Sequence, residues 1–390
     1  MVTMQHFFDS IHLQGILSFA PDSEPIPLGP LNVLIGPNGS GKSNLLEVIS
    51  LLRAIPVDLA GAIRDGGGIG EWRWNGKTHR GYSTIDCVLV RRQQNRRAAN
   101  DSIRYRFGLD PWLIVEELIQ KNGEAINLYS SAFGEAVIFE EGTDMADPKE
   151  IALSSLDLDK SVLAQIRDIN RYSTLTWLGV RLQDIEIYQD SSFGRFTAFR
   201  QPQPADLPND NLLPDGRNLG LVLNAIEHSG DWMRLQSIVK QFLPRFERLS
   251  IKVEAGTVQV FMHEAGLKTP TPAVRLSDGT LRFLGLLAIL LSPSPAPLIC
   301  IDEPEMGLHP DAIHLLAELM VDASKRTQLI VTTHSDVLIS ALTKQAESVL
   351  VCENNQGTRI KALDSDKLRF WMARYRLGDL WRMGELGGNP

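Results

Sequence analysis

Short apolar runs and amphipathic segments alternate along much of the chain. The run 31–35 (LNVLI) is continuously apolar, as expected for a strand covered on both faces, and 45–55 then carries apolar residues at helical spacing. The same order returns later, where apolar runs at 298–302 and 327–332 flank an amphipathic stretch at 311–325. This alternation predicts an α/β fold with a mixed sheet at its core.

The segment between these two regions predicts further strands and helices. The stretches 83–90, 102–109 and 135–142 are expected to be successive antiparallel strands. Residues 147–190 carry a more helical pattern, whereas the stretch 61–81, rich in glycine and tryptophan, is expected to be an irregular loop.

The boundaries between predicted elements are clearer in the C-terminal half. Hairpins are predicted at 250–266 and 347–363, and the proline-rich stretch 201–217 is expected to be a linker or exposed loop. The apolar run 283–291 is too short for a membrane span, which needs about 20 residues, so it predicts a buried helix.

Composition and charge narrow the class of protein. The 390 residues are 43% hydrophobic and carry a net charge of −8, so a large core is available and a surface that coats nucleic acid is not expected. Cys87, Cys300 and Cys352 lack metal-site spacing and are expected to be buried thiols. The run RRQQNRR at 91–97 suits either a solvated turn or a contact to DNA phosphates.

Arginines and aromatic residues alternate near the C-terminus, a pattern that favours a docking or packing segment over a nucleic-acid surface. These residues are Arg369, Arg374, Arg376, Arg382, Trp371, Tyr375 and Trp381.

A complete phosphate-loop motif follows the first buried strand. GPNGSGKS fits G-x-x-x-x-G-K-[ST] and lies between a predicted strand and a predicted helix, which is the context that the motif requires. Backbone N–H groups of the loop would face the β-phosphate, Lys42 would reach the β- and γ-phosphates, and Ser43 would bind Mg²⁺. The nucleotide-binding residues are therefore predicted to be Gly36, Pro37, Asn38, Gly39, Ser40, Gly41, Lys42, Ser43 and Asn44.

Acids and a histidine follow two later strands. Asp302 and Glu303 end the run LICIDE, and a carboxylate at the end of such a strand points into the crevice where α/β proteins bind ligands. Asp302 is predicted to hold Mg²⁺ and Glu303 to act as general base on the attacking water. His334 follows the strand 327–332 and is predicted to reach the γ-phosphate.

The turn LSDGT at 276–280 precedes the apolar helix and has two interpretations from its residues alone. It is either an ordinary helix N-cap or an anion site at a helix N-terminus.

The order of these motifs resembles the head of ABC-type ATPases. The residues that carry the resemblance are GPNGSGKSN (36–44), LSDGT (276–280), LICIDEPEMGLHP (298–310) and TTHS (332–335). GKSN, DEPE and GLHP are similar to the soluble RecF/SMC/OLD group, and YRLGDLWRMGELGG (375–388) resembles the tail of bacterial RecF-like ATPases.

The resemblance implies an ATPase that uses ATP and Mg²⁺ and forms a head-to-tail homodimer with ATP between the protomers. In such heads the signature turn binds the γ-phosphate held by the partner's phosphate loop. The residues that would act in trans are Leu276, Ser277, Asp278, Gly279 and Thr280. The group commonly serves in DNA repair or phage defence, which implies a cytoplasmic switch that gates a second protein such as a nuclease, with DNA as a further partner and no membrane.

The resemblance also implies an organisation in three parts. Residues 1–145 would form the N-terminal half of the head with the phosphate loop, 146–245 an inserted and mostly helical region with a linker, and 246–390 the C-terminal half. The stretch from about 90 to 270 looks globular, so the long coiled-coil arms of SMC proteins are not expected, nor does an acidic cluster resembling a TOPRIM nuclease follow.

Two features of the family pattern are not located by the sequence. The glutamine that touches Mg²⁺ in ABC heads has four candidates, Gln93, Gln94, Gln183 and Gln189. The residue that recognises the base is also open, because core packing better explains the N-terminal aromatics Phe7, Phe8 and Phe19.

Two other functions stay open at this point. The first is the ATPase subunit of a membrane transporter, against which GKSN, DEPE and the large insertion count. The second is a nucleotide-gated regulator with little turnover, against which Glu303 counts, because a switch that never hydrolyses ATP has no use for a general base.

Overall fold

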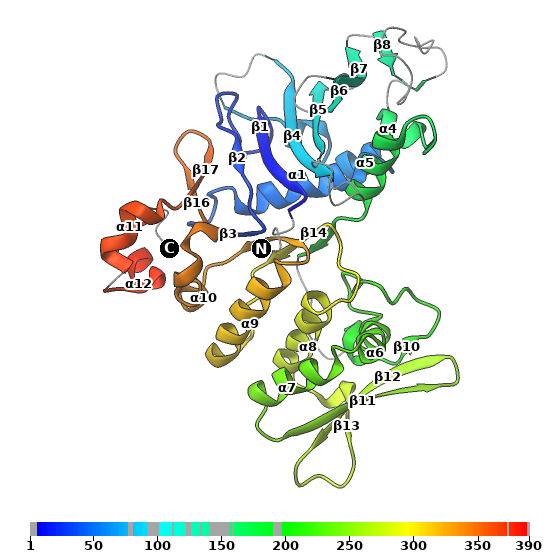
Figure 1. The fold of residues 1–390 in the computed structure, drawn as a ribbon, viewed down its shortest axis with the longest axis vertical. Coiled ribbons are helices and arrows are strands. Elements are labelled where there is room, and N and C mark those ends of the chain that lie inside the picture. The colour runs from blue at the N-terminus through cyan, green and yellow to red at the C-terminus, as the bar shows by residue number, and fades with distance from the viewer. Residues whose placement is uncertain are drawn as a thin grey trace.

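The computed structural model shows an elongated chain built around three β-sheets (Figure 1). An antiparallel sheet lies at one end, a mixed sheet crosses the middle, and a lobe of helices with a smaller sheet lies at the other end. The structure describes residues 6–76, 81–91, 101–110, 113–121, 126–132, 135–139, 156–157, 160–189, 197–372 and 374–387.

The central sheet has six strands and determines where the candidate site lies. Its order is β17 (Thr358–Ala362), β16 (Val349–Asn354), β3 (Leu31–Ile35), β15 (Gln328–Thr332), β14 (Leu298–Asp302) and β9 (Glu186–Tyr188). Every neighbouring pair is parallel except β16 and β17. The carboxyl ends of β3, β14 and β15 therefore meet at one edge, so the motifs that follow these strands are brought together.

Strand β3 is buried along its whole length, which confirms the prediction from its apolar sequence. Leu34 packs in a core on the side of the antiparallel sheet, Val33 packs in a core on the side of the helical lobe, and Ile35 packs against the C-terminal helices. The side chain of Asn32 is also buried and donates a 3.0 Å hydrogen bond to the Leu329 carbonyl oxygen.

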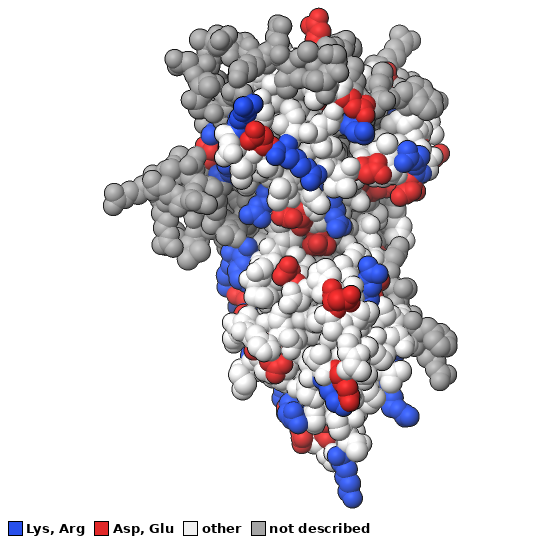
Figure 2. All heavy atoms as spheres, turned by 90° about the vertical axis from the view of Figure 1, so that its right-hand side faces the viewer, with Lys and Arg blue, Asp and Glu red and all other residues white. Residues whose placement is uncertain are grey.

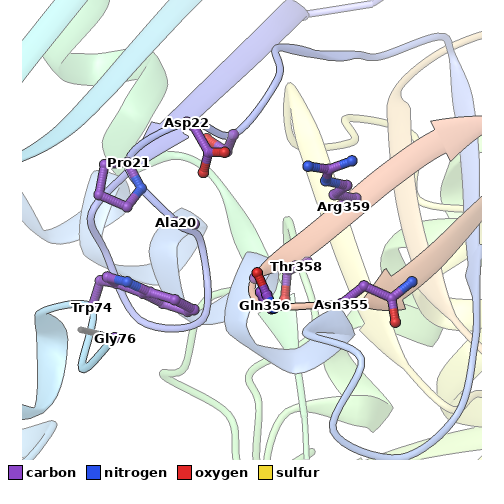
Figure 3. Close-up of a pocket in the computed structure, with 11 residues that line it drawn as sticks. Ala20, Pro21, Asp22, Trp74, Gly76, Asn355, Gln356, Thr358 and Arg359 are labelled. Carbon is purple, nitrogen blue, oxygen red and sulfur yellow. The ribbon is translucent and has the colours of Figure 1, made fainter. Parts of the chain in front are cut away.

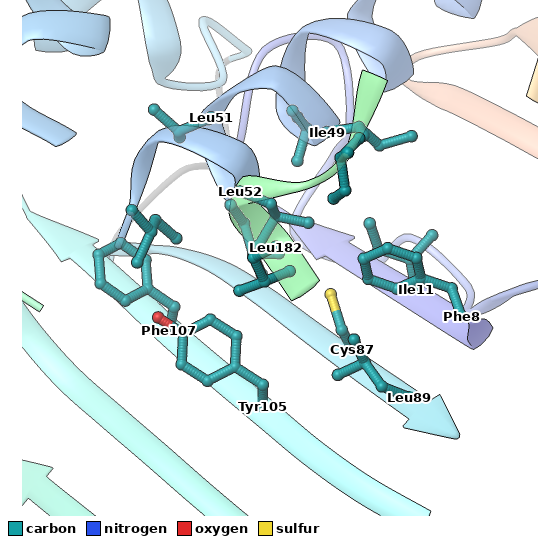
Figure 4. Close-up of a cluster of buried hydrophobic side chains, with 14 of the residues drawn as sticks. Phe8, Ile11, Ile49, Leu51, Leu52, Cys87, Leu89, Tyr105, Phe107 and Leu182 are labelled. Atoms are coloured by element: carbon teal, nitrogen blue, oxygen red, sulfur yellow. The ribbon is translucent and has the colours of Figure 1, made fainter. Parts of the chain in front are cut away.

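A seven-stranded antiparallel sheet covers one face of the central sheet, with helices α1 (Lys42–Ala54), α4 (Val162–Gln165) and α5 (Ser173–Gln183) packed at the same core. Its order is β2 (Ile26–Pro27), β1 (Phe8–Gln14), β4 (Ser83–Arg91), β5 (Asp101–Asp110), β6 (Leu113–Lys121), β7 (Ile126–Ala132) and β8 (Glu135–Ile138). Figure 4 shows side chains of α1, β1, β4 and β5 meeting in this core.

The other lobe combines helices with a small antiparallel sheet. The sheet has the order β10 (Gln203–Pro204), β12 (Thr257–Glu264) and β11 (Phe246–Glu254), and β13 (Thr271–Pro272) pairs with β12. The helices are α6 (Leu219–Ser229), α7 (Trp232–Phe242), α8 (Asp278–Leu290) and α9 (Pro310–Ala323). Helix α8 is mostly buried, which confirms the buried helix predicted at 283–291.

The remaining elements are short. Helices α10 (Asp336–Ala341), α11 (Ser365–Met372) and α12 (Leu377–Arg382) lie beside β16 and β17, and 3₁₀ helices occur at η2 (Ala198–Arg200), η3 (Ala273–Arg275) and η4 (Thr343–Ser348). The irregular loop predicted at 61–81 is wrong in part, because α2 (Leu59–Asp65) and α3 (Ile69–Trp72) form there. Asp58 caps α2 by accepting the Gly61 N–H at 2.9 Å, and buried Trp72 anchors α3 to the core.

The predicted three-part organisation stays a prediction. Strand β9 lies in the predicted insertion 146–245, yet it pairs with β14 of the C-terminal half. Helices α6 and α7 of the same stretch pack in one core with α8 and α9. The three cysteines are buried in strands β4, β14 and β16, as expected.

Candidate functional site

The phosphate loop connects β3 to α1 and depends on two glycines. Gly36 has φ 150°, and a Cβ at this position would overlap the carbonyl oxygen of Cys352. Gly41, at the start of α1, has φ 100°, and a Cβ there would overlap the side chain of Thr358. Glycine is thus required at both positions by backbone conformation and by the closeness of β16 and β17.

Lys42 lies inside the loop with only 6% of its surface exposed. Its Nζ donates to the carbonyl oxygens of Gly36 (2.7 Å) and Pro37 (3.1 Å). Burial lowers the pKa of Lys42, and the neighbouring Cys352, Glu303 and Asp302 oppose this effect. The hydroxyl of Ser40 is buried with no hydrogen-bond partner among the described residues, so the loop has a polar group available for an anion.

The β16–β17 hairpin supports the phosphate loop from outside. Asn354 Nδ2 donates to the Gly39 carbonyl oxygen at 3.0 Å, and Thr358 Oγ1 lies 3.0 Å from the Ser40 carbonyl oxygen. Ser18 Oγ lies 2.7 Å from Thr358 Oγ1 and also accepts from Asn44. These contacts could not be predicted from the sequence, because nothing in a hairpin more than 300 residues away marks it as a neighbour of the loop.

Asp302 ends β14 beside the end of β15, and Glu303 follows it. Thr332 Oγ1 donates to Asp302 Oδ1. Glu303 has φ 43°, a left-handed conformation that costs a residue with a side chain about 1–2 kcal/mol. Its N–H bonds the carbonyl oxygen (3.2 Å) and Oγ1 (3.1 Å) of Thr332, which stabilises this backbone.

His334 completes a group of four charged or titratable side chains. Its Nε2 lies 3.5 Å from Glu303 Oε1, and both side chains are about one-third exposed. Burial and then the Lys42 charge lower the pKa of His334, while Glu303 and Asp302 oppose them. The structure therefore brings together the predicted residues Lys42, Asp302, Glu303 and His334, with a neutral imidazole favoured.

Glu305 lies beside His334, although the sequence motifs did not predict a role for it. Its Oε1 accepts from Thr333 Oγ1 (2.5 Å) and from the His334 N–H (3.1 Å), which holds the turn after β15. Its Oε2 is buried and makes no hydrogen bond among the described residues. Burial raises the pKa of this carboxyl. The second glutamate of DEPE was the available signal in the sequence.

The turn 276–280 begins α8, and part of this turn is exposed to solvent. Ser277 is the N-cap, and its Oγ accepts from the Thr280 N–H at 3.1 Å. Asp278 is ion-paired with Arg200, which also donates to the Leu276 carbonyl oxygen at 2.5 Å. The side chains of Ser277 and Asp278 face solvent. Within the part of the chain that the structure describes, no hydrogen bond or ion pair joins this turn to the phosphate loop of the same chain.

The structure favours one of the four glutamines. Gln189 follows β9, whose Tyr188 is opposite Ile301 of β14, so Gln189 lies at the same edge as Asp302. Gln183 is exposed at the end of α5, and Gln93 and Gln94 lie outside the described residues. The aromatics Phe7, Phe8 and Phe19 are buried in the core, as expected.

A cavity of about 830 Å³ opens beside the phosphate loop (Figure 3). Pro21 and Trp74 lie on one side, and Gln356 and Arg359 of the β16–β17 hairpin lie on the other. Thr358, which also lines the cavity, lies 3.0 Å from the carbonyl oxygen of Ser40 in the phosphate loop. The cavity thus adjoins the loop and offers an aromatic ring with polar groups, which suits the nucleoside part of a nucleotide.

The basic segments are only partly described. Arg91 donates to Thr174 Oγ1 at 2.6 Å and lies over the Trp177 ring, while 92–97 fall outside the described residues. In the C-terminal segment, Trp381 is fully buried and Arg382 pairs with Asp336 at 3.3 Å, in agreement with a packing role. No helix in the described part of the chain is long and apolar enough to cross a membrane.

The sheet order and the grouping of motifs at one edge define a P-loop domain with the fold of Smc heads. The model of one protein family, described as "AAA domain, putative AbiEii toxin, Type IV TA system", matches residues 31–340. The chain belongs to this family.

Solved structures of Smc heads share the fold. An Smc head bound to the C-winged helix domain of ScpA is 16% identical, with a TM-score of 0.57 over 93% of this chain and 99% of that chain. An Smc head with an extended coiled coil, bound to the C-terminal domain of ScpA and derived from Pyrococcus furiosus, is 15% identical, with a TM-score of 0.54 over 94% and 98%.

A curated relative is the Old nuclease of Escherichia phage P2. It is 28% identical in an alignment of 184 residues that covers 39% of this chain and 30% of that protein. The chain thus matches less than a third of the relative's length.

Proposed function

We propose that the chain binds and hydrolyses ATP with Mg²⁺, and that ATP joins two copies head to tail as a switch. The observation that carries this proposal is the convergence of Lys42, Asp302, Glu303 and His334 at the edge where β3, β14 and β15 end. A cation, two carboxylates and an imidazole therefore lie at one glycine-rich loop. ATP hydrolysis needs groups of these kinds.

Phosphate binding is assigned to the loop and its lysine. The N–H groups of 38–43 and the Lys42 ammonium would bind the β- and γ-phosphates, and the buried hydroxyl of Ser40 would gain a partner there. Ser43 and Asp302 offer a hydroxyl and a carboxylate oxygen, a donor set that fits Mg²⁺. Bound Mg²⁺ would neutralise charge on the phosphates.

The chemical step is assigned to Glu303 and His334. The Glu303 carboxylate would accept a proton from the attacking water, and its backbone is fixed by Thr332. The His334 ring would donate a hydrogen bond to the γ-phosphate, and Glu305 holds the backbone from which this ring projects. Gln189 would approach Mg²⁺ from the neighbouring strand end.

The second copy would complete each site with its signature turn. Ser277 and Asp278 are exposed at the N-terminus of α8, a 13-residue helix whose dipole favours an anion. In the proposed dimer this turn faces the γ-phosphate held by the other chain. ATP then acts as the bridge between protomers, and hydrolysis releases it.

The output of the switch is proposed to be the gating of a second protein with nuclease or similar activity, in DNA repair or phage defence. The similarity to a phage protein named as a nuclease supports this direction. Positive charge on strands β5 and β6 is matched by acids, in the pairs Arg104–Asp86, Arg106–Glu116 and Lys121–Asp101. On the face of the molecule that Figure 2 shows, basic and acidic side chains are likewise interspersed. This balance leaves RRQQNRR as the first segment to mutate in a test of DNA binding.

The head-to-tail arrangement is tested by mixing two inactive variants, Lys42→Ala and Ser277→Arg. Each variant alone should lack ATPase activity. A heterodimer holds one site with an intact phosphate loop and an intact signature turn, so an equal mixture should recover up to about a quarter of wild-type activity if subunits pair at random and the two sites act independently. A mixture of folded variants that neither regains activity nor dimerises with Mg-ATP would contradict a site shared between two chains.

The assignment of the base is tested with Glu303→Gln. This variant should bind ATP, should form a dimer that light scattering detects in the presence of Mg-ATP, and should hydrolyse ATP about 100-fold or more slowly. Turnover at the wild-type rate would show that Glu303 is not the base.

A further inference from the structure

Arg282 connects the signature helix to the backbone of the proposed base. It lies on α8, two residues after the signature turn, and its Nη2 donates a 2.9 Å hydrogen bond to the Glu303 carbonyl oxygen. Thr332 accepts a hydrogen bond from the N–H of the same residue. The peptide groups on both sides of the Glu303 Cα are therefore bonded, one to β15 and the other to α8.

Glu303 needs this support because of its conformation. A φ of 43° for a glutamate is unfavourable, and such backbones persist only where the surroundings fix them. The support from Thr332 comes from within the central sheet. The support from Arg282 comes from the other lobe, so it depends on where α8 lies relative to β14.

Arg282 lies in a partly buried environment with two glutamates nearby. The guanidinium is about half-buried, burial lowers its pKa, and the carboxylates of Glu305 and Glu303 oppose this. The start of α8 also packs closely on the turn after β14, because a Cβ at Gly279 would lie 2.9 Å from the Gly307 carbonyl oxygen. A movement of the signature turn would therefore reach the segment after β14 at two points, Gly307 and Glu303, and the Arg282 bond is the contact to Glu303 itself.

We propose that Arg282 is a positioning residue that sets the backbone of Glu303 according to the position of the signature helix. It lets engagement of the signature turn by the other chain's ATP orient the base in its own chain. This inference rests on the proposed function, since it takes Glu303 as the base. It adds that the two sites of the dimer communicate within each chain, through one guanidinium.

The experiment compares Arg282→Ala and Arg282→Lys with the wild type in steady-state ATPase assays. Arg275→Ala is the matched control, because Arg275 is an exposed arginine just before the signature turn. In both Arg282 variants kcat should fall by about 10- to 100-fold while KM for ATP changes by less than about threefold, since the base is misplaced and the nucleotide contacts remain. Added guanidinium ion at a non-denaturing concentration should restore part of kcat in Arg282→Ala and leave Arg275→Ala unchanged.

The same variants placed on Glu303→Gln should still dimerise with Mg-ATP. A kcat equal to the wild type would overturn the inference. So would a loss of dimerisation, or an equal loss of ATP binding, because Arg282 would then hold the fold or the interface. If Arg282→Ala fails to fold, the test rests on Arg282→Lys, because lysine keeps the positive charge but lacks the planar guanidinium with its several donors. A wild-type chain without ATPase activity would instead refute the proposed function.

Discussion

The side chain of Thr358, at the start of β17, occupies the space that a Cβ would need at Gly41, at the start of α1. The phosphate loop is thus shaped by a residue more than 300 positions away. This close contact predicts how a substitution of Gly41 affects ATP binding.

Gly41→Ala should weaken ATP binding by at least about tenfold, because the loop must move away from Thr358 and abandon its left-handed residue. Isothermal titration with ATP measures the effect. Gly256→Ala is the control, since Gly256 has φ 76° with open space around it at the β11–β12 turn. An ATP affinity of Gly41→Ala equal to that of Gly256→Ala and of the wild type would show that neither Thr358 nor the left-handed backbone restricts position 41.

Trp74→Ala should weaken ATP binding by about tenfold, since stacking of a base on an aromatic ring contributes about 1–3 kcal/mol. Tripolyphosphate lacks a base, so its affinity should be unchanged. Trp74→Phe, which keeps an aromatic ring in the cavity, should retain most of the ATP affinity. Parallel losses for both ligands would place the nucleoside outside this cavity.

Glu117 predicts a dependence of stability on pH. Its buried carboxylate accepts from Tyr105 Oη (2.9 Å), Ser161 Oγ (2.5 Å) and the Val162 N–H (2.9 Å). Burial raises the pKa of Glu117, against the effect of these hydrogen bonds. The folded state then keeps its proton to a higher pH than the unfolded state, whose carboxyl titrates near pH 4.3.

Between these two pKa values unfolding releases a proton, so the contribution of Glu117 to the free energy of unfolding falls as the pH rises. Urea unfolding of the wild type and of Glu117→Gln should show this. The wild type should be more stable by about 1–3 kcal/mol at pH 4, because glutamine cannot accept all three bonds. The difference should shrink toward neutral pH, and a difference that grows with pH would contradict the raised pKa.

Trp381→Ala should reduce the free energy of unfolding by about 3–5 kcal/mol, since its side chain is fully buried with Leu377 and Leu380 against Ile35 and Val349. Trp371→Ala is the control, because Trp371 is 38% exposed and should cost about 1 kcal/mol or less. Chemical denaturation measures both variants. Similar small losses would mean that α12 does not belong to the cooperative core.

Local patterns allowed much of the fold and site to be predicted. A phosphate loop and an acidic strand end are recognisable from a few adjacent residues, and the continuous apolar run of β3 predicted burial on both faces. The order of the motifs along the chain then indicated the class of head. These features depend on the neighbours of each residue in the sequence.

Other features depend on contacts that no local pattern encodes. Gln189 could be distinguished from Gln183 only when β9 was seen to pair with β14. Arg282 and Glu305 looked like ordinary helix and loop residues until packing placed them beside Glu303 and His334. The helices at 59–72 were not predicted, because the many glycines of this stretch favour a loop. The helix cap at Asp58 and the burial of Trp72 outweigh that preference.

The pairing of β3 with β15 and β16 has a consequence for synthesis of the chain. The ribosome releases the phosphate-loop strand early, but both of its sheet neighbours and the hairpin that supports the loop lie beyond residue 327. A nascent chain therefore carries a complete phosphate-loop sequence long before it can hold a nucleotide. Only a chain translated through β17 has the hairpin contacts that support the phosphate loop in this fold.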